Sequence, residues 1–490
     1  MCWRQRLLVP WTLDLRSLAL LRILLGVILL LNFAVRARDV TAFYTDVGVL
    51  PRSEVPLADR WVSVHFLGGN TSFIEILLLI QAVAAVAFVL GVSTRLTTLV
   101  NWYLLVSLHI RNPLVQNYGD IILAMLLFWG IFLPLGARWS LDAWHRRRDD
   151  SDRFPRAGDS ADSEGNAVVS LATMALVIQV MMIYVFSAVL KTDPQWRSEF
   201  TAVHHALSLD FFVKPLGLAI RNQTFLMEFI TIGTMILELI VPFALLIPWK
   251  NGPIRCLVVL LFIGFHIGLI LAMYLGLFPY VCIAMWLGLL PSWFWNRLVF
   301  GKSTTEPLST AGALPPLVSI IVAVILGFLL LDQTLQAVQG GDPRDQRLSN
   351  WRARVGQVMP IRQHWAMFAP KPMDWNGWYV VEAELTDGRR LDIAGHEPQP
   401  LRWDHPEDIA DSYRDQRWRK YLNNLTYLRN FSHRANFAAW KWREWEMRHP
   451  DQPLSKITVW FLRELIHDNG SIEPAVPILF STVTRRATEE

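Results

Sequence analysis

The chain has 490 residues, of which 53% are hydrophobic and 18% are charged, and its mean hydropathy is positive. A soluble protein of this length carries about a quarter charged residues, so the composition excludes an ordinary soluble enzyme. The net charge of +4 provides no large basic surface, and no nucleic-acid partner is expected. The three cysteines form no pair with the spacing of a disulfide or a metal site, and no metal is predicted.

The apolar residues are concentrated in runs close to the roughly 20 residues that a helix needs to cross a bilayer. Only helices satisfy their own backbone in lipid over such uninterrupted runs. The sequence therefore predicts an all-α polytopic membrane domain of about nine transmembrane helices in residues 1–335, with membrane lipids as partners. The expected spans are 17–35, 73–91, 96–110, 119–136, 167–189, 225–248, 254–275, 277–295 and 315–333.

Lysine and arginine are unequally divided between the loops on the two sides of the predicted bundle. With nine spans, the side that holds the N-terminus collects fourteen of them and the opposite side collects nine. The positive-inside rule therefore predicts a cytoplasmic N-terminus. The charged segment 144–166 is then expected to be a mobile cytoplasmic linker, and the region after the ninth span lies outside.

Residues 336–490 contain no further spanning run and are rich in charged residues and tryptophan. The segment 378–393 has two strand-like halves joined by Thr-Asp-Gly, which is a strong hairpin signal. The segment 409–448 has the pattern of two helices, and two further strands are expected near 457–466 and 476–485. The sequence predicts a small extracytoplasmic α+β domain.

Charged groups inside spans are costly, so each is a candidate functional residue. Glu238 and His266 both fall in the middle of a predicted span. His266 can form an interhelical hydrogen bond or belong to a site, and Glu238 can pair with His266 or with Arg22. Arg22 lies near the cytoplasmic end of the first span, and we expect its side chain to extend to the lipid headgroups.

A second group of polar residues gathers on the outer side of the predicted bundle. Asp120 begins the fourth span, with Asn117 just before it, Lys191 ends the fifth span, and Glu228 begins the sixth. Each can be a helix-end charge on its own. Together they predict one cavity that opens toward the outer leaflet, with His266 reaching it from below.

The segment YVFSAVLKTDPQW (184–196) resembles the segment of vitamin K-dependent gamma-carboxylases that holds their catalytic lysine. Lys191 falls on that lysine, with Asp193 and Trp196 in step in a Lys-x-Asp-x-x-Trp pattern. HIGLILAMYLGLFPYVCIA (266–284) is similar to the family's histidine-containing helix and the Gly-x-Phe-Pro-Tyr stretch after it. Other segments are similar to the wider bacterial superfamily that shares the horizontally transferred transmembrane (HTTM) domain, namely 43–52, 111–120, 138–144, 364–372 and 377–392.

The resemblance implies an enzyme of the bacterial inner membrane in the carbon–carbon lyase class. In that family a quinol, here reduced vitamin K or menaquinol, is deprotonated and reacts with O2 to form an epoxide. The strong base so generated removes a γ-proton from a peptide glutamate, and CO2 adds to the carbanion. A lysine can begin this reaction because an amine is a base when neutral, and desolvation favours its neutral form. The implied partner is a secreted glutamate-containing peptide.

Two departures leave peptide carboxylation open. The eukaryotic carboxylases carry a functional histidine at the start of the fourth span, where this chain reads Asn117-Tyr118-Gly119-Asp120, and their disulfide has no counterpart. Outside the motif, Lys191 would be an exposed interfacial lysine whose loss the fold tolerates. The alternative function is a membrane maturation or immunity factor of the same superfamily without quinol chemistry. A transporter would show inverted repeats, which the sequence lacks.

Overall fold

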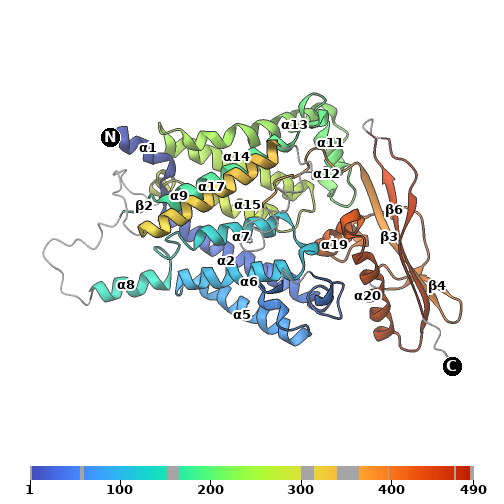
Figure 1. The fold of residues 1–490 in the computed structure, drawn as a ribbon. Coiled ribbons are helices and arrows are strands. Elements are labelled where there is room, and N and C mark those ends of the chain that lie inside the picture. Colours follow the sequence, from blue (N-terminus) through green and yellow to red (C-terminus); the bar gives the residue numbers. More distant parts are fainter. Residues whose placement is uncertain are drawn as a thin grey trace.

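The computed structural model describes residues 3–55, 60–151, 165–298, 314–338, 363–395, 397–467 and 471–485. A bundle of long helices forms the larger part of the protein, and a smaller domain built on a β-sheet lies at one end of it (Figure 1). The predicted division at 335/336 falls within α17, the last helix of the bundle, which ends at Val338.

Six helices in the described part of the chain are long and apolar enough to cross a membrane, or seven if one bent pair is a single span. The bent pair is α15 and α16, whose axes differ by 82°. The six are α2 (Leu15–Arg38), α5 (Thr71–Leu90), α9 (Leu171–Leu190), α13 with η5 (Thr224–Leu246), α14 (Asn251–Ala272) and α17 (Pro316–Val338).

The remaining predicted spans also coincide with helices, but these are shorter or more polar. α6 (Thr94–Arg111) contains charged residues, α7 (Tyr118–Gly130) has only 13 residues, and the bent pair consists of α15 (Phe278–Leu287) and α16 (Ser292–Leu298). Each predicted span therefore contains a helix, whereas the count of nine membrane crossings stays a prediction.

The bundle has apolar side chains on its outside and polar side chains in its interior. Phe225 of α13 is 83% exposed and Leu317 of α17 is 69% exposed, whereas Gln179 of α9 and Asn101 of α6 are fully buried. A water-soluble helical protein has the opposite arrangement. This surface suits contact with lipid chains.

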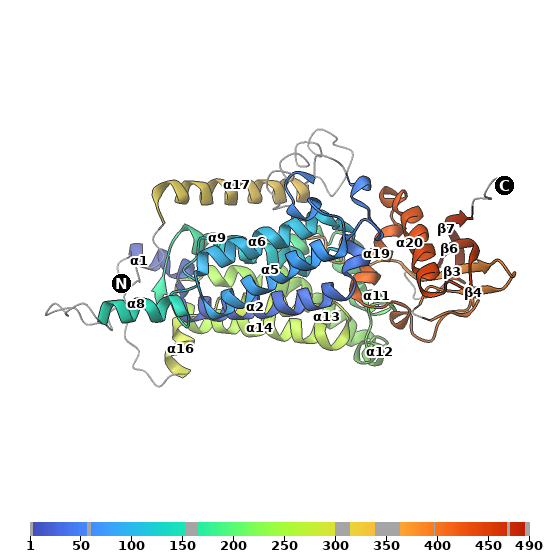
Figure 2. The same ribbon diagram turned by 90° about the horizontal axis from the view of Figure 1, so that it is seen from below.

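The N-terminal helix α1 (Trp3–Leu8) and α8 (Leu141–Ser151) lie at the end of the bundle opposite the sheet domain (Figures 1 and 2). A short antiparallel ladder between β1 (Leu13–Asp14) and β2 (Ala167–Val168) joins the two chain segments at this end. The predicted linker 144–166 is helical as far as residue 151, and residues 152–164 of it lie outside the described part.

The C-terminal domain contains a five-stranded antiparallel sheet in the order β5-β4-β3-β6-β7. The predicted hairpin is confirmed, and Gly388 in its turn has a φ of 85°, a conformation that glycine adopts without strain. The strands are β3 (Trp375–Leu385), β4 (Arg390–Asp392), β5 (Gln399–Pro400), β6 (Leu454–Leu465) and β7 (Val476–Thr484).

Two helices precede β6, as predicted, and one of them attaches the domain to the bundle. α20 (His433–Arg448) packs on β6 and β7, while α19 (Gln416–Thr426) lies between the sheet and the bundle (Figure 1). Asn424 of α19 donates to the carbonyl of Leu114 at 2.6 Å, and Arg419 donates to the carbonyls of Phe211 and Tyr274. Side chains of α19 therefore bind backbone carbonyls of the loops at this end of the bundle.

The loop between α9 and α13 forms three short helices near the same end of the bundle: α10 (Pro194–Arg197), α11 (Ala202–Leu207) and α12 (Pro215–Ile220). A hydrogen bond from the backbone amide of Lys214 to the carbonyl of Ala272 ties this loop to the end of α14. The loop thus covers the end of the bundle where α9 terminates.

Candidate functional site

Lys191 stands directly after the last residue of α9. Ser170 and Thr173 begin this helix with a capping box, and Pro194 prevents it from continuing beyond the Lys191 turn. The guanidinium of Arg197 donates to the carbonyl of Lys191 at 2.9 Å and to that of Val189 at 3.3 Å. These two bonds satisfy carbonyls that the helix end leaves without a partner.

The side chain of Lys191 turns back into the bundle. Only 2% of the residue is exposed, and its Nζ donates to Oγ of Ser187, one turn earlier in α9, at 3.1 Å. The same Nζ forms a salt bridge with Oε2 of Glu238 in α13. An interfacial lysine would extend toward water instead. The alternative in which Lys191 is an exposed helix-end charge is therefore wrong.

Trp196 and Asp193, the other two residues of the motif, hold the chain around the amine. The ring of Trp196 lies 4.7 Å from Nζ of Lys191, within the range of a cation–π contact. Its Nε1 donates to the carbonyl of Phe368 at 2.9 Å, and the amide of Asp193 donates to that of Pro370 at 3.4 Å. The segment that follows the last bundle helix thereby fixes the ring against the lysine.

Further buried polar side chains lie deeper in the bundle beside α9. Tyr184, Ser187 and Lys191 are spaced three and four residues apart, so they share one face of α9. The hydroxyl of Tyr184 lies 2.8 Å from Nε2 of His266 and accepts a hydrogen bond from Nε1 of Trp286, also at 2.8 Å. Lys191, Glu238 and Ser187 thus form one buried polar group, and Tyr184, His266 and Trp286 form a second group further along the same face of α9.

Glu238 was expected to pair with His266 or Arg22, and both expectations are wrong. Its partner is Lys191, and Tyr184 takes the bond to His266. The expectation that the side chain of Arg22 extends to the lipid headgroups is also wrong. Arg22 is fully buried, and its guanidinium donates to backbone carbonyls, including that of Leu135 at 3.0 Å. These carbonyls belong to turns where neighbouring segments end, so the guanidinium serves as their cap.

His266 lies in an aromatic environment in the middle of α14. It is fully buried, and the ring centroids of Phe265 and Phe278 lie 5.2 Å and 5.7 Å from that of the imidazole. Its Nδ1 is buried and has no hydrogen-bond partner within the described part of the protein. A buried polar atom of this kind is costly unless something binds it. Nδ1 is therefore available to a bound molecule.

Asp120 lies in a different set of contacts. Asn117 caps α7, and Asp120 completes the capping box. The carboxylate of Asp120 forms salt bridges with Arg36 at 3.0 Å and with Arg417 of α19 at 3.2 Å. Asp120 thus joins the bundle to the C-terminal domain. Glu228 lies exposed on α13. The structure therefore brings Lys191 together with Glu238 rather than with Asp120 or Glu228.

Three residues of this region were missed by the sequence reasoning: Tyr184, Ser187 and Trp286. A signal for the first two was present, because they stand seven and four residues before Lys191 on one helical face. No local signal identifies Trp286, which reaches Tyr184 from a helix 102 positions later.

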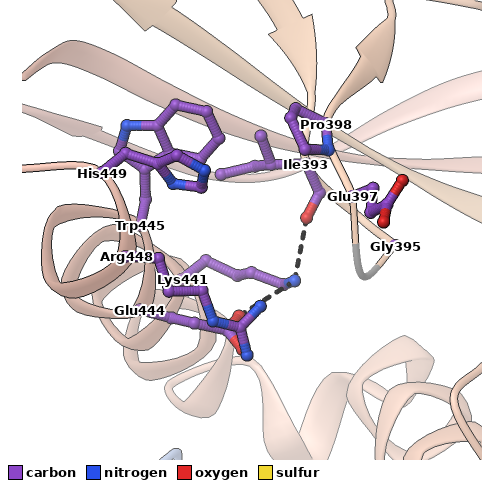
Figure 3. A pocket seen from close by; sticks show the side chains of 9 residues that line it. All are labelled: Ile393, Gly395, Glu397, Pro398, Lys441, Glu444, Trp445, Arg448 and His449. Atoms are coloured by element: carbon purple, nitrogen blue, oxygen red, sulfur yellow. Dashed lines mark hydrogen bonds and ion pairs between the residues drawn. The ribbon is translucent and has the colours of Figure 1, made fainter. Parts of the chain in front are cut away.

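A hollow in the C-terminal domain lies between α20 and the loop at 393–398 (Figure 3). Lys441 projects toward it and donates to the carbonyls of Ile393 and Ala394 at 2.8 Å and 3.2 Å, and it pairs with Glu444 at 3.2 Å. Burial lowers the pKa of Lys441 to about 8, and the charge of Glu444 opposes this shift. All three ammonium hydrogens have an acceptor, which fits a structural role.

A family model described as the HTTM domain matches residues 12–293. No curated protein and no solved structure matches the chain.

Proposed function

The chain belongs to the HTTM domain family, and from this premise we propose that it is a membrane enzyme that deprotonates a quinol and oxidises it with O2 to the quinone epoxide, one oxygen atom entering the epoxide and the other leaving as water with the two hydroxyl protons. Lys191 is the proposed base. The buried contact of its amine with Glu238 is the observation that carries the proposal.

The contact provides a way to make a neutral amine inside a membrane. Both side chains are almost fully buried, with exposures of 2% and 6%. Two isolated charges are costly in such surroundings, and passing the proton from Nζ to Oε2 removes both. Nζ then carries a lone pair that can accept the proton of a hydroxyl group. Glu238 is the proton acceptor for Lys191 in this scheme.

Buried groups near the pair and further along α9 offer contacts for a quinol ring. Nδ1 of His266 has no hydrogen-bond partner among the described residues and lies among aromatic rings, so it can bond to a ring oxygen. Residues of α13 and α14 face outward with apolar side chains, which suits an isoprenoid tail. When bound, the quinol would supply the oxidisable ring. Trp196 and the segment at 368–370 would keep water from the amine.

The experiment measures epoxide formation in membranes that contain the full chain. Reduced vitamin K and menaquinol are supplied separately with O2, and the epoxide is quantified by chromatography. Glu238→Gln keeps the size of the side chain but can neither take a proton from Lys191 nor balance the ammonium that forms when Lys191 accepts the proton of the quinol. We therefore expect a loss of about a hundred-fold or more. Glu75→Gln is the matched control, because Glu75 is exposed on the spanning helix α5.

Two outcomes would redirect the proposal. Epoxide formed at equal rates by wild type and Glu238→Gln would remove the pair from the mechanism. No epoxide from wild type with either quinol would favour the alternative, a membrane maturation or immunity factor of the same superfamily. Carboxylation is a separate step, tested by incorporation of labelled bicarbonate into a glutamate-rich peptide.

The proposed location is the bacterial inner membrane, with the N-terminus in the cytoplasm and the C-terminal domain outside. The excess of basic residues at the α8 end supports this orientation. The sheet domain lies at the opposite end of the bundle, which agrees with it (Figure 2). The proposed substrate peptide would then meet the enzyme on the outer side.

A further inference from the structure

Arg111 is a buried cation at the end of α6 with few partners. The residue is fully buried, and its Nη1 donates to the carbonyl of Leu50 at 2.8 Å. Its Nε and Nη2 have no hydrogen-bond partner in the part of the chain that the structure describes. The nearest carboxylate is that of Asp46, 3.8 Å from Nη2 and therefore beyond hydrogen-bond distance.

The carboxylates of this region are already bound by other side chains. Asp46 is 38% exposed and is bound by the guanidinium of Arg52, with a shortest contact of 2.6 Å. Asp120 already accepts hydrogen bonds from three side chains, those of Asn32, Arg36 and Arg417. Among the described residues, Arg111 therefore shares the single carboxylate of Asp46 with Arg52, and the two guanidinium groups exceed it by one positive charge. Such a charge is strongly unfavourable unless a counter-ion binds.

His65 places a further hydrogen-bond donor near Arg111. Ser107 and Arg111 are four residues apart on α6 and share a face, and Oγ of Ser107 lies 2.6 Å from Nδ1 of His65. Because Ser63 donates to the carbonyl of Ser107 at 2.7 Å, the Ser107 hydroxyl is free to donate to Nδ1. The proton of the neutral imidazole is then on Nε2, which is buried and has no hydrogen-bond partner among the residues that the structure describes.

The charge state of His65 agrees with this assignment. Burial, and after it the charges of Arg111 and Arg36, lower the pKa of His65 to about 3. The imidazole is therefore neutral near pH 7. The geometry places the two residues side by side: the ring of Phe66, next to His65 in the chain, lies 5.5 Å from the guanidinium carbon of Arg111, and His65 itself contacts Ser107 one turn earlier in α6.

We propose that Arg111 and His65 form a binding site for a small monovalent anion between α6 and the segment 63–66. Three N–H groups are available to it: Nε and Nη2 of Arg111 and Nε2 of His65. The anion completes these hydrogen bonds and balances the guanidinium charge. Chloride and bicarbonate share this chemistry and are distinguished by the experiment. The site does not depend on the quinol reaction proposed above.

The test is the thermal unfolding of the detergent-solubilised full chain at constant ionic strength. Sodium chloride or sodium bicarbonate replaces sodium gluconate, whose anion is too bulky for a site of three N–H groups. We expect the midpoint to rise saturably by about 2 °C or more in the bound anion. The salt with the lower half-saturation concentration identifies the anion.

Two variants locate the effect. Arg111→Gln removes the positive charge of the site. Ser107→Ala removes only the hydroxyl that orients His65 and leaves the surrounding packing in place, so it still tests the site if Arg111→Gln fails to fold. We expect the half-saturation concentration to rise at least about ten-fold in each. Arg95→Gln, at an exposed position of the same helix, should behave as wild type. An equal midpoint in all three salts, or an unchanged shift in Ser107→Ala, would overturn the proposal.

Discussion

Breaking the Lys191–Glu238 contact from one side should destabilise the protein far more than removing both groups. Nζ of Lys191 and Oε2 of Glu238 are shielded from solvent, with side-chain exposures of 2% and 6%, so water screens neither charge well. Loss of one member of a buried pair costs about 3–5 kcal/mol, because the other charge stays buried. Lys191→Met also loses the bond to Ser187, worth about 1 kcal/mol.

The double variant Lys191→Met with Glu238→Gln leaves no buried charge. We expect its stability to lie within about 2 kcal/mol of wild type. Since the two single losses sum to at least about 7 kcal/mol, the coupling energy in a double-mutant cycle should be at least about 5 kcal/mol. The assay is thermal unfolding of purified full-length protein. We expect the unfolding midpoint of each single variant to lie at least about 5 °C below that of wild type. Glu75→Gln controls for the loss of an exposed carboxylate from a spanning helix.

Additive effects of the two single variants would refute this reasoning, since they would mean that the two groups do not interact. The prediction replaces the expectation that Lys191 can be removed without structural consequence, which assumed an exposed side chain. It also sharpens the functional test. A stable double variant that makes no epoxide separates the loss of chemistry from the loss of fold.

Three other predictions follow from the geometry. Asp120→Asn leaves Arg36 and Arg417 without their shared counter-charge, so the C-terminal domain should be released by limited proteolysis at least ten times faster than in wild type. Burial lowers the pKa of Lys441 from 10.5 in the unfolded state to about 8 in the folded state. Between pH 8 and pH 10.5 the unfolded state therefore binds more protons than the folded state, and the local free energy of unfolding rises with pH by up to about 3 kcal/mol. Hydrogen exchange of α20, corrected for intrinsic rates, should therefore slow between pH 8 and 10, and Lys441→Met should lack this trend. On intact cells an impermeant thiol reagent should label Ala410→Cys but not Arg147→Cys, and the reverse pattern would invert the proposed orientation.

The sequence was sufficient for the elements whose signals are local. Apolar runs located the helices, and the Asp387-Gly388 turn located a hairpin whose glycine has the expected positive φ. The span count was less certain, because α7 is only 13 residues long and α15 and α16 are bent by 82°. Length and hydropathy cannot decide whether such segments cross a bilayer.

The partners of buried charges could not be predicted, because they depend on contacts between distant parts of the chain. Glu238 lies 47 positions from Lys191, and Arg417 lies 297 positions from Asp120. The sequence also permits two placements of an arginine near the end of a span: its guanidinium can extend to the lipid headgroups, or it can bind backbone carbonyls inside the protein. Arg22 takes the second because the turn at 135–139 and the end of α5 both lie beside it.

The bond between Trp196 and the carbonyl of Phe368 has a consequence for biosynthesis. Its two residues are 172 positions apart, so α9 and the lysine enter the membrane long before the segment that fixes the tryptophan ring has been made. At about 5–20 residues per second, the ribosome needs roughly 9 to 34 seconds to synthesise the stretch between them. During this interval the ring has no fixed position over the amine. A chain truncated before residue 368 would therefore insert its helices but would lack the carbonyl that holds the ring of Trp196 over the amine of Lys191.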